Sequence, residues 1–147
     1  MKIQKQKIVL IEDDAALGNS ILELLHLNNF EVTWFDDSTQ ALVYLTQNIP
    51  DLIISDLMMP KMNGGELFFQ IRKNKKFTTV PYIIITANVD DETKLRQLEL
   101  GVNDYIMKPF KVKELIFKVN NVLELRKNIE KNFGIDPFSK VTIKLSE

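Results

Sequence analysis

Acidic side chains, a hydroxyl group and an amine each stand at the end of a short apolar run in this chain of 147 residues. Glu12-Asp13-Asp14 follows the first run, Asp56 and Thr86 follow the third and fourth, and Lys108 follows the fifth. Carboxylates that lie close together repel one another unless a cation lies between them. Oxygen ligands without a neighbouring His or Cys favour Mg²⁺, which keeps several waters and needs few protein ligands. If the fold brings these segments together, the sequence predicts a magnesium site.

Asp56 is the best candidate for a nucleophile, because carboxylates form acyl phosphates. A divalent ion beside it would neutralise the acidic groups and orient an incoming phosphoryl group for in-line attack. Lys108 would hold one phosphoryl oxygen as a point charge, and the Thr86 hydroxyl would hold another. These residue types together predict phosphoryl transfer to a carboxylate.

Five apolar runs, with helical patterns between them, must position these side chains. The runs cover residues 8–11, 32–35, 52–54, 82–85 and 105–107. Continuous apolarity is typical of strands that are covered on both faces, as in a parallel sheet. Between the runs, apolar residues recur at helical spacing, and we expect Asp14, Ser38 and Asp90 to be helix N-caps.

The alternation of strands and helices predicts an α/β fold, a (βα)5 doubly wound parallel sheet of strand order 2-1-3-4-5. Crossovers between parallel strands are right-handed, which limits the possible topologies. In such sheets the functional cleft lies at the carboxyl ends of strands 1 and 3. The candidate residues follow their strands directly, so we expect one cleft to hold them all.

Composition and charge exclude several classes of protein. Hydrophobic residues make up 45% and charged residues 27% of the chain, as in ordinary globular domains. No apolar run approaches the ~20 residues of a membrane span. The absence of cysteine suits a reducing cytoplasm. The net charge of −1 lacks the basic excess of nucleic-acid-binding surfaces. We expect a cytoplasmic location, with no direct contact between this fragment and nucleic acid or membrane.

The character of the sequence changes after Arg126. We expect residues 1–127 to form one domain, and residues 128–147 to be a linker or tail toward an absent output domain. The preceding helix could continue through residues 127–131, but Gly134 and Pro137 should end it. Residues 141–145 alternate like a short strand, so a C-terminal strand that joins a sheet edge is the competing interpretation.

Over residues 5–127 the chain resembles the receiver domains of two-component response regulators. The matching segments are residues 8–14, 50–64, 81–87 and 101–110. Asp13 precedes Asp56 by 43 residues, Thr86 follows 30 residues later, and Lys108 follows after 22 more. The resemblance implies a flavodoxin-like fold and a histidine kinase as phosphodonor. It also implies a signalling phosphoacceptor, which catalyses only its own phosphorylation and slow autodephosphorylation.

The resemblance also assigns roles around a magnesium ion. Asp56 would be the phosphoacceptor and would give a side-chain oxygen to the ion. Asp13 would contact the ion directly and Glu12 through water, and Met58 would contribute its backbone carbonyl. Asp14 matches no ligand and remains the expected cap of the first helix.

A second group of residues would transmit the signal. Thr86 and Tyr105 match the switch pair, in which the threonine moves toward the phosphoryl group and the aromatic ring turns inward. Lys108 matches the phosphate-binding lysine, and Pro109 would follow a cis peptide bond. The switch pair would link the phosphoryl group to the face of the fourth helix, fifth strand and fifth helix, where charges of both signs suit a phosphorylation-dependent homodimer.

The sequence says less about the output domain that such a receiver would control. The end of the chain resembles receivers of hybrid sensor–regulators that precede an AraC-type helix-turn-helix domain, which would regulate transcription. A stand-alone receiver with a tail, or a receiver from another kind of regulator, remains an alternative.

Competing functions lack required residues. A phosphatase of the haloacid-dehalogenase kind needs a second Asp two residues after the nucleophile, where this chain has Met58. A flavin mononucleotide site would need a Ser/Thr/Gly-rich loop after the first strand, where Glu12-Asp13-Asp14 would repel phosphate. We expect His26 to lie on a helix surface. We expect Trp34 to be a packing residue, away from strands 1 and 3 and from the metal.

Overall fold

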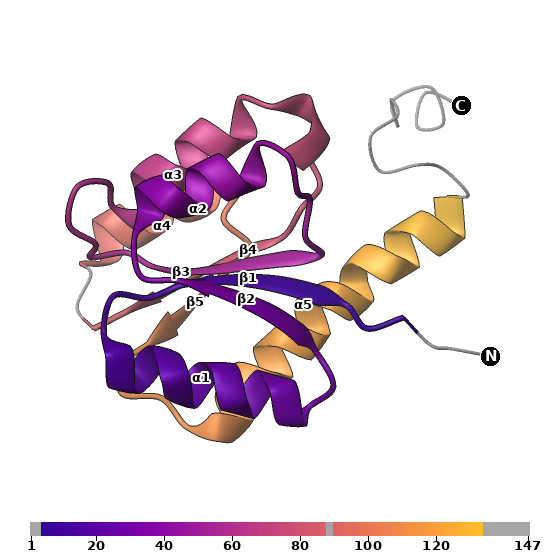
Figure 1. Ribbon diagram of the computed structural model, residues 1–147. Helices are drawn as coiled ribbons and strands as arrows, with labels where there is room; N and C mark the ends of the chain where they lie inside the picture. Colours follow the sequence, from indigo (N-terminus) through magenta and orange to yellow (C-terminus); the bar gives the residue numbers. More distant parts are fainter. Residues whose placement is uncertain (1–3, 88–89, 134–147) are drawn as a thin grey trace.

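A five-stranded parallel sheet lies between two layers of helices (Figure 1). The structure is a computed structural model, and it describes residues 4–87 and 90–133. Its elements are, in chain order, β1 Lys7–Ile11, α1 Ala15–Leu27, β2 Glu31–Phe35, α2 Ser38–Leu45, β3 Leu52–Asp56, α3 Gly64–Arg72, the 3-10 turn η1 Lys75–Phe77, β4 Tyr82–Thr86, α4 Asp91–Glu99, β5 Asp104–Met107 and α5 Val112–Phe133.

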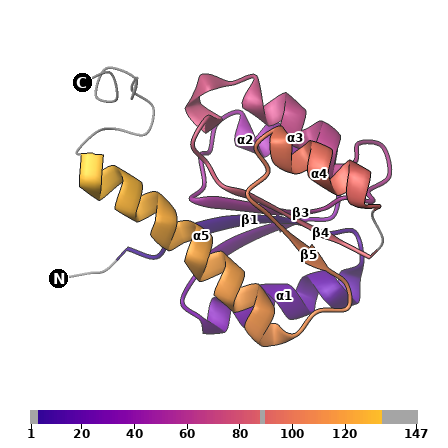
Figure 2. The same ribbon diagram turned by 180° about the vertical axis from the view of Figure 1, so that it is seen from behind.

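The strand order is β2-β1-β3-β4-β5, and every neighbouring pair is parallel. Helices α1 and α5 cover one face of the sheet, and α2, α3 and α4 cover the other, as the opposed views in Figures 1 and 2 show. This is the predicted doubly wound α/β fold. All five strands therefore end at the same side of the sheet.

The central strands are buried on both faces, which explains their continuous apolarity. Every residue of β3 and β4 is buried. Ile53 and Ile84 pack toward α2 and α3, whereas Ile54 and Ile83 pack toward α1 and α5. Full burial of such a side chain stabilises the fold by roughly 1.5–3 kcal/mol. The two cores hold the strand ends in fixed register.

Helix α5 packs through its N-terminal half and then extends past the sheet (Figure 1). Leu115 and Val119 are fully buried, but Leu125 and Ile129 are exposed. The helix crosses the expected boundary at residue 127 and reaches Phe133. Of the predicted tail of residues 128–147, residues 134–147 lie outside the described residues. Neither α5 nor any other helix in the described part of the chain is both long and apolar enough to cross a membrane.

Two of the three expected N-caps are confirmed. The Asp14 side chain accepts a hydrogen bond from the Leu17 backbone N–H at 3.0 Å, at the start of α1. Asp90 accepts from the Thr93 backbone N–H at 2.7 Å, at the start of α4. These carboxylates satisfy backbone donors that the first helical turn leaves unpaired.

The expected cap of α2 is wrong, because Asp37 takes the place predicted for Ser38. Asp37 accepts hydrogen bonds from the Thr39 backbone at 2.8 Å and from the Thr39 hydroxyl at 2.6 Å. Lys61 pairs with the other Asp37 oxygen at 3.1 Å. The Thr39 bonds, together with Lys61, lower the pKa of Asp37 to about 2. Ser38 is instead the buried first residue of the helix.

Candidate functional site

The carboxyl ends of β1, β3 and β4 lie side by side in the sheet. Ile11 of β1 pairs with Ser55 of β3, and Asp56 pairs with Ile85 of β4. Glu12 follows Ile11 directly, and Thr86 ends β4. The predicted convergence of the strand ends is therefore confirmed.

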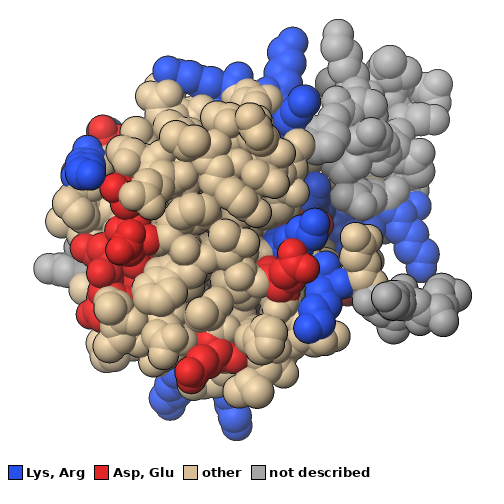
Figure 3. Space-filling model, in the orientation of Figure 1, with Lys and Arg blue, Asp and Glu red and all other residues tan. Residues whose placement is uncertain are grey.

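Three carboxylates meet at this end of the sheet. Glu12, Asp13 and Asp56 each have one oxygen within 4.8 Å of the others. Glu12 is 1% exposed and Asp56 is 5% exposed, whereas Asp13 is exposed. Acidic side chains gather at the left edge of Figure 3, where the strands end in Figure 1. The cluster thus has two buried carboxylates and one that is open to solvent.

Lys108 joins the two buried carboxylates. Its Nζ lies 2.7 Å from Asp56 Oδ2 and 3.0 Å from Glu12 Oε1. Burial alone would lower the pKa of Lys108, but the hydrogen bonds and charges of Asp56 and Glu12 raise that pKa above its usual value. The amine therefore stays charged and offsets part of the negative charge.

The charge on Glu12 is only partly compensated. Burial, with a contribution from the Asp56 charge, raises the pKa of Glu12 to about 7. The Asp14 backbone N–H, which donates to Glu12 at 3.1 Å, and the Lys108 amine act in the opposite direction. A buried carboxyl with a raised pKa favours a cation that would replace its proton. This donor set, three carboxylates without His or Cys, suits a hard divalent ion.

The hydroxyl of Thr86 lacks a hydrogen-bond partner among the residues that the structure describes, although it is buried. Such an unpaired group costs roughly 1–3 kcal/mol, so it needs an explanation. Thr86 ends β4, next to β3, which ends in Asp56. A ligand that enters the site can supply the missing acceptor.

Tyr105 is buried in the core on the side of the sheet that α2 and α3 cover, with 2% of its surface exposed. This burial raises the pKa of Tyr105 to about 12. On the other side of β5, Lys118 of α5 donates to the Tyr105 carbonyl at 2.6 Å and to Asp104 Oδ1 at 3.1 Å. Thr86 and Tyr105 thus lie on adjacent strands, and the aromatic ring is already inward.

The loop after β3 shapes the site around Asp56. The Met58 backbone N–H donates to Asp56 Oδ1 at 3.0 Å, while the Met58 side chain is exposed. The Gly64 N–H donates to the Leu57 carbonyl at 2.9 Å. A Cβ at Gly64 would lie 2.4 Å from the Asp56 carbonyl oxygen. Gly64, which has no role in the predicted site, lets α3 begin this close to the strand end.

The expectation that Trp34 lies away from strand 1 is wrong. Strand β2 pairs directly with β1, and Trp34 is opposite Leu10. The indole Nε1–H donates to the Glu12 backbone carbonyl at 2.9 Å. The predicted sheet order, with strand 2 beside strand 1, already implies this proximity. His26, by contrast, is exposed in the last turn of α1, as expected.

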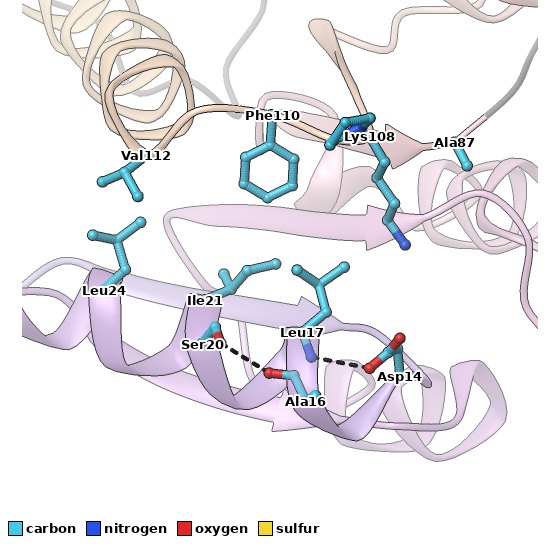
Figure 4. A pocket seen from close by; sticks show the side chains of 11 residues that line it. Asp14, Ala16, Leu17, Ser20, Ile21, Leu24, Ala87, Lys108, Phe110 and Val112 are labelled. Carbon is cyan, nitrogen blue, oxygen red and sulfur yellow. Dashed lines mark hydrogen bonds between the residues drawn. The ribbon is translucent and has the colours of Figure 1, made fainter.

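An apolar groove adjoins the charged site. It lies between α1 and the segment that follows β5, and Figure 4 shows Leu17, Ile21 and Leu24 facing it from α1, with Phe110 and Val112 opposite. Lys108 stands at one end of this groove. The peptide bond between Lys108 and Pro109 is cis, as the resemblance implied.

Curated proteins of known function are similar to this chain. A family model described as the response regulator receiver domain matches residues 8–120. Hybrid signal transduction histidine kinase D of Dictyostelium discoideum is 34% identical over 148 residues, 97% of this chain and 9% of that protein. The DNA-binding response regulator MtrA of Mycobacterium tuberculosis is 38% identical over 128 residues, 87% of this chain and 54% of that protein. The chain therefore spans about half, or less, of these relatives' length.

Solved structures of receiver domains are also similar to this chain. The non-phosphorylated HemR receiver domain from Leptospira biflexa is 34% identical with a TM-score of 0.75, covering 81% of this chain and 94% of that one. The receiver domain of sensor histidine kinase PA1611 from Pseudomonas aeruginosa, which has a magnesium ion coordinated in its active site cleft, is 30% identical with a TM-score of 0.75, covering 82% and 99%. With its doubly wound sheet and carboxylate cluster, the chain belongs to the response regulator receiver domain family, whose members are signalling phosphoacceptors of two-component systems.

Proposed function

We propose that Asp56 is the phosphoacceptor of this receiver, and that it takes its phosphoryl group from a histidine kinase. Receiver domains accept phosphoryl groups from such kinases. The observation that carries the proposal is the position of Asp56, buried in a cluster of three carboxylates with Lys108 Nζ at 2.7 Å. Of these carboxylates, Asp56 alone also accepts a backbone hydrogen bond from the loop after β3.

A magnesium ion fits this donor set. Asp13 and Asp56 would hold it through side-chain oxygens, Met58 through its backbone carbonyl, and Glu12 through water. The raised pKa of Glu12, about 7, supports a cation in this position. The magnesium in the cleft of the similar PA1611 receiver supports the same ion. When bound, the ion supplies positive charge that offsets the cluster and the incoming phosphoryl oxygens.

Asp56, Lys108 and Thr86 then have separate roles in the phosphoryl transfer. The Asp56 carboxylate attacks phosphorus in line, and the new O–P bond forms as the P–N bond to the donor imidazole breaks. The imidazole nitrogen keeps the electron pair of the broken bond. The Lys108 amine, now 2.7 Å from Asp56 Oδ2, is near enough to neutralise a phosphoryl oxygen. The unpaired Thr86 hydroxyl donates to another oxygen of the group.

Phosphoryl uptake from a small donor tests the proposal. We expect the protein to gain the mass of one phosphoryl group from phosphoramidate in Mg²⁺, and to gain none in EDTA. Hydroxylamine should remove the group, because it cleaves acyl phosphates. Intact-mass spectrometry measures both results. Equal uptake with and without Mg²⁺, or none in either, would contradict the proposal.

We also propose that phosphorylation strengthens a two-fold contact through α4, β5 and α5. Lys118 and Asp104 place both charges on this face, which suits a self-complementary contact. Leu98 and Met107 add exposed apolar surface, at 37% and 39%. The buried Thr86 and Tyr105 connect the site to this face through adjacent strands.

Sedimentation velocity measures this dimerisation. We expect a monomer or weak dimer at rest, and a tighter dimer with beryllofluoride, which mimics the phosphoryl group. Thr86→Ala should bind the mimic but respond less, because the link to β5 is lost. If this variant dimerises as the parent does, the switch role fails while the acceptor role survives.

We also propose that this receiver acts in the regulation of transcription. The similarity to the DNA-binding response regulator MtrA, of which the chain spans 54%, supports such an output. The similarity to hybrid signal transduction histidine kinase D supports the alternative, a receiver within a hybrid kinase. Whether the gene encodes a DNA-binding domain or a kinase domain together with this receiver distinguishes the two outputs.

A further inference from the structure

Trp34 is bonded to the backbone of the acidic segment. It is the chain's single Trp. Its indole Nε1–H donates to the Glu12 carbonyl at 2.9 Å, and the Glu12 N–H donates to the Phe35 carbonyl at 3.0 Å. Both peptide groups that flank Glu12 are therefore held by β2, one through the backbone and one through a side chain.

The peptide group that the indole holds is the one that joins Glu12 to Asp13. Its orientation sets the directions in which these two side chains leave the backbone. Both carboxylates belong to the cluster whose oxygens lie within 4.8 Å of one another. Glu12 follows the last residue of β1, so the regular strand pairing ends at this point. The indole hydrogen bond therefore holds the backbone in place beyond the end of β1.

Helix α1 makes room for this indole. A Cβ at Gly18 would lie 2.2 Å from Trp34 Cζ2 and 2.4 Å from Cε2, closer than any side chain can approach. Glycine is unfavourable inside a helix, so its place here needs a packing reason. The Gly18 N–H donates to the Asp14 carbonyl at 2.8 Å, in the turn that follows the acidic pair. The ring thus lies between the start of α1 and the end of β1.

We propose that Trp34 is a positioning residue of the metal site, and that Gly18 is required for its placement. The indole fixes the Glu12–Asp13 peptide so that both carboxylates face Asp56. The inference rests on the proposed Mg²⁺ site, and it adds that the affinity for the ion depends on a hydrogen bond to the backbone of the acidic pair. It further follows that Trp34 fluorescence responds to Mg²⁺.

Trp34→Phe tests the hydrogen bond, because it keeps an aromatic ring and removes the donor. We expect Mg²⁺ to bind about three- to tenfold more weakly in calorimetric titration, as the loss of one ordinary hydrogen bond predicts. Phosphoryl uptake by this variant should need a higher Mg²⁺ concentration than in the parent, because Phe at this position weakens the metal site but leaves Asp56 and Lys108 in place. Val32→Ala is the matched control, since Val32 is half-buried on the same strand and packs against the same core. It should bind Mg²⁺ like the parent.

Gly18→Ala tests the same contact from the helix side. The added methyl group must displace the indole, so we expect a similar loss of Mg²⁺ affinity with the tryptophan still present. Asn19→Ala, at an exposed neighbouring position of α1, should have no effect. Addition of Mg²⁺ should also change the Trp34 emission of the parent, and this change should disappear in Asp13→Ala.

The outcomes separate this inference from the proposed function. If the parent binds no Mg²⁺ in the calorimeter, the proposed metal site itself fails. If the parent binds but Trp34→Phe and Gly18→Ala bind equally well, only the positioning role fails. Equal losses in Trp34→Phe and Val32→Ala would mean general loosening of the core and would overturn the role as well. If Trp34→Phe does not fold, the Mg²⁺ affinities of Gly18→Ala and Asn19→Ala are compared instead. Equal affinities of these two variants would overturn the positioning role.

Discussion

Asp56→Asn should abolish phosphoryl uptake, at least about a hundredfold below the parent, as the loss of a nucleophile predicts. The amide has the size of the carboxylate but lacks its negative charge. It can keep the hydrogen bond from the Met58 N–H, which now reaches Asp56 Oδ1 at 3.0 Å, so the loop after β3 should keep its shape. Intact-mass spectrometry after incubation with phosphoramidate and Mg²⁺ measures the loss.

Asp14→Asn is the matched control for this prediction. Asp14 neighbours the acidic pair, and its side chain caps α1 by accepting from the Leu17 N–H at 3.0 Å. Asparagine caps helices about as well as aspartate, so uptake should be that of the parent. A full mass gain in Asp56→Asn, or a phosphoryl group mapped to Asp13, would remove Asp56 from the acceptor role.

The fold and the convergence of the site could be predicted because both depend on local patterns. Strands β3 and β4 are buried on both faces, so they appear in the sequence as continuous apolar runs. Parallel connection then places all carboxyl ends at one side of the sheet. The polar residue after each run was therefore expected in one cleft. Lys108, which lies 52 residues from Asp56 in sequence, contacts it at 2.7 Å.

Contacts that depend on distant segments could not be predicted in the same way. The bond from Trp34 to the Glu12 carbonyl involves a backbone acceptor, which any residue can supply, so no residue type marks it. The choice of Asp37 over Ser38 as a cap is favoured by Lys61, which belongs to another loop. Besides the predicted sheet order, the isolated Gly18 was a usable signal, because a glycine within a helix indicates close packing.

The continuation of α5 beyond residue 127 could be expected from the sequence. Polar composition after Arg126 marks the end of the packed core, but it does not end a helix. The chain has neither Gly nor Pro between Phe110 and Phe133, and the helix continues to Phe133. Exposed Leu125 and Ile129 confirm that this part of α5 leaves the core.

Lys108→Met should destabilise the metal-free protein by about 3 kcal/mol at about pH 8, because breaking a buried charge pair leaves the partner charges uncompensated. Methionine keeps most of the apolar stem and removes the amine. Glu12 and Asp56, at 1% and 5% exposure, would then face each other without the cation that lies 3.0 Å and 2.7 Å from them. Urea unfolding in EDTA measures the loss. Excess Mg²⁺ should restore part of the stability, because it supplies positive charge to the same carboxylates.

The cost of this substitution should grow with pH. The pKa of Glu12 is raised from 4.5 to about 7 in the folded protein, mainly by burial. The folded state therefore keeps a proton that the unfolded chain loses above about pH 4.5, so this group lowers stability progressively as pH rises toward 7. Lys108 opposes that effect, and its removal raises the pKa of Glu12 further. At about pH 6 the variant should hold a protonated Glu12 and lose less stability, because only the Asp56 charge is then left without its cation, whereas at about pH 8 the two carboxylates also repel each other.

Lys61→Met is the matched control, because it removes a paired lysine that lies outside the carboxylate cluster. Lys61 also pairs with a carboxylate, Asp37 at 3.1 Å, but its side chain is 68% exposed. Water and salt screen such a pair, so the variant should resemble the parent at both pH values. An equal loss for Lys108→Met at both pH values would contradict the charge explanation. A loss that Mg²⁺ does not reduce would mean that the carboxylates of Glu12, Asp13 and Asp56 do not bind the ion, because a bound cation must relieve the repulsion that Lys108 leaves behind.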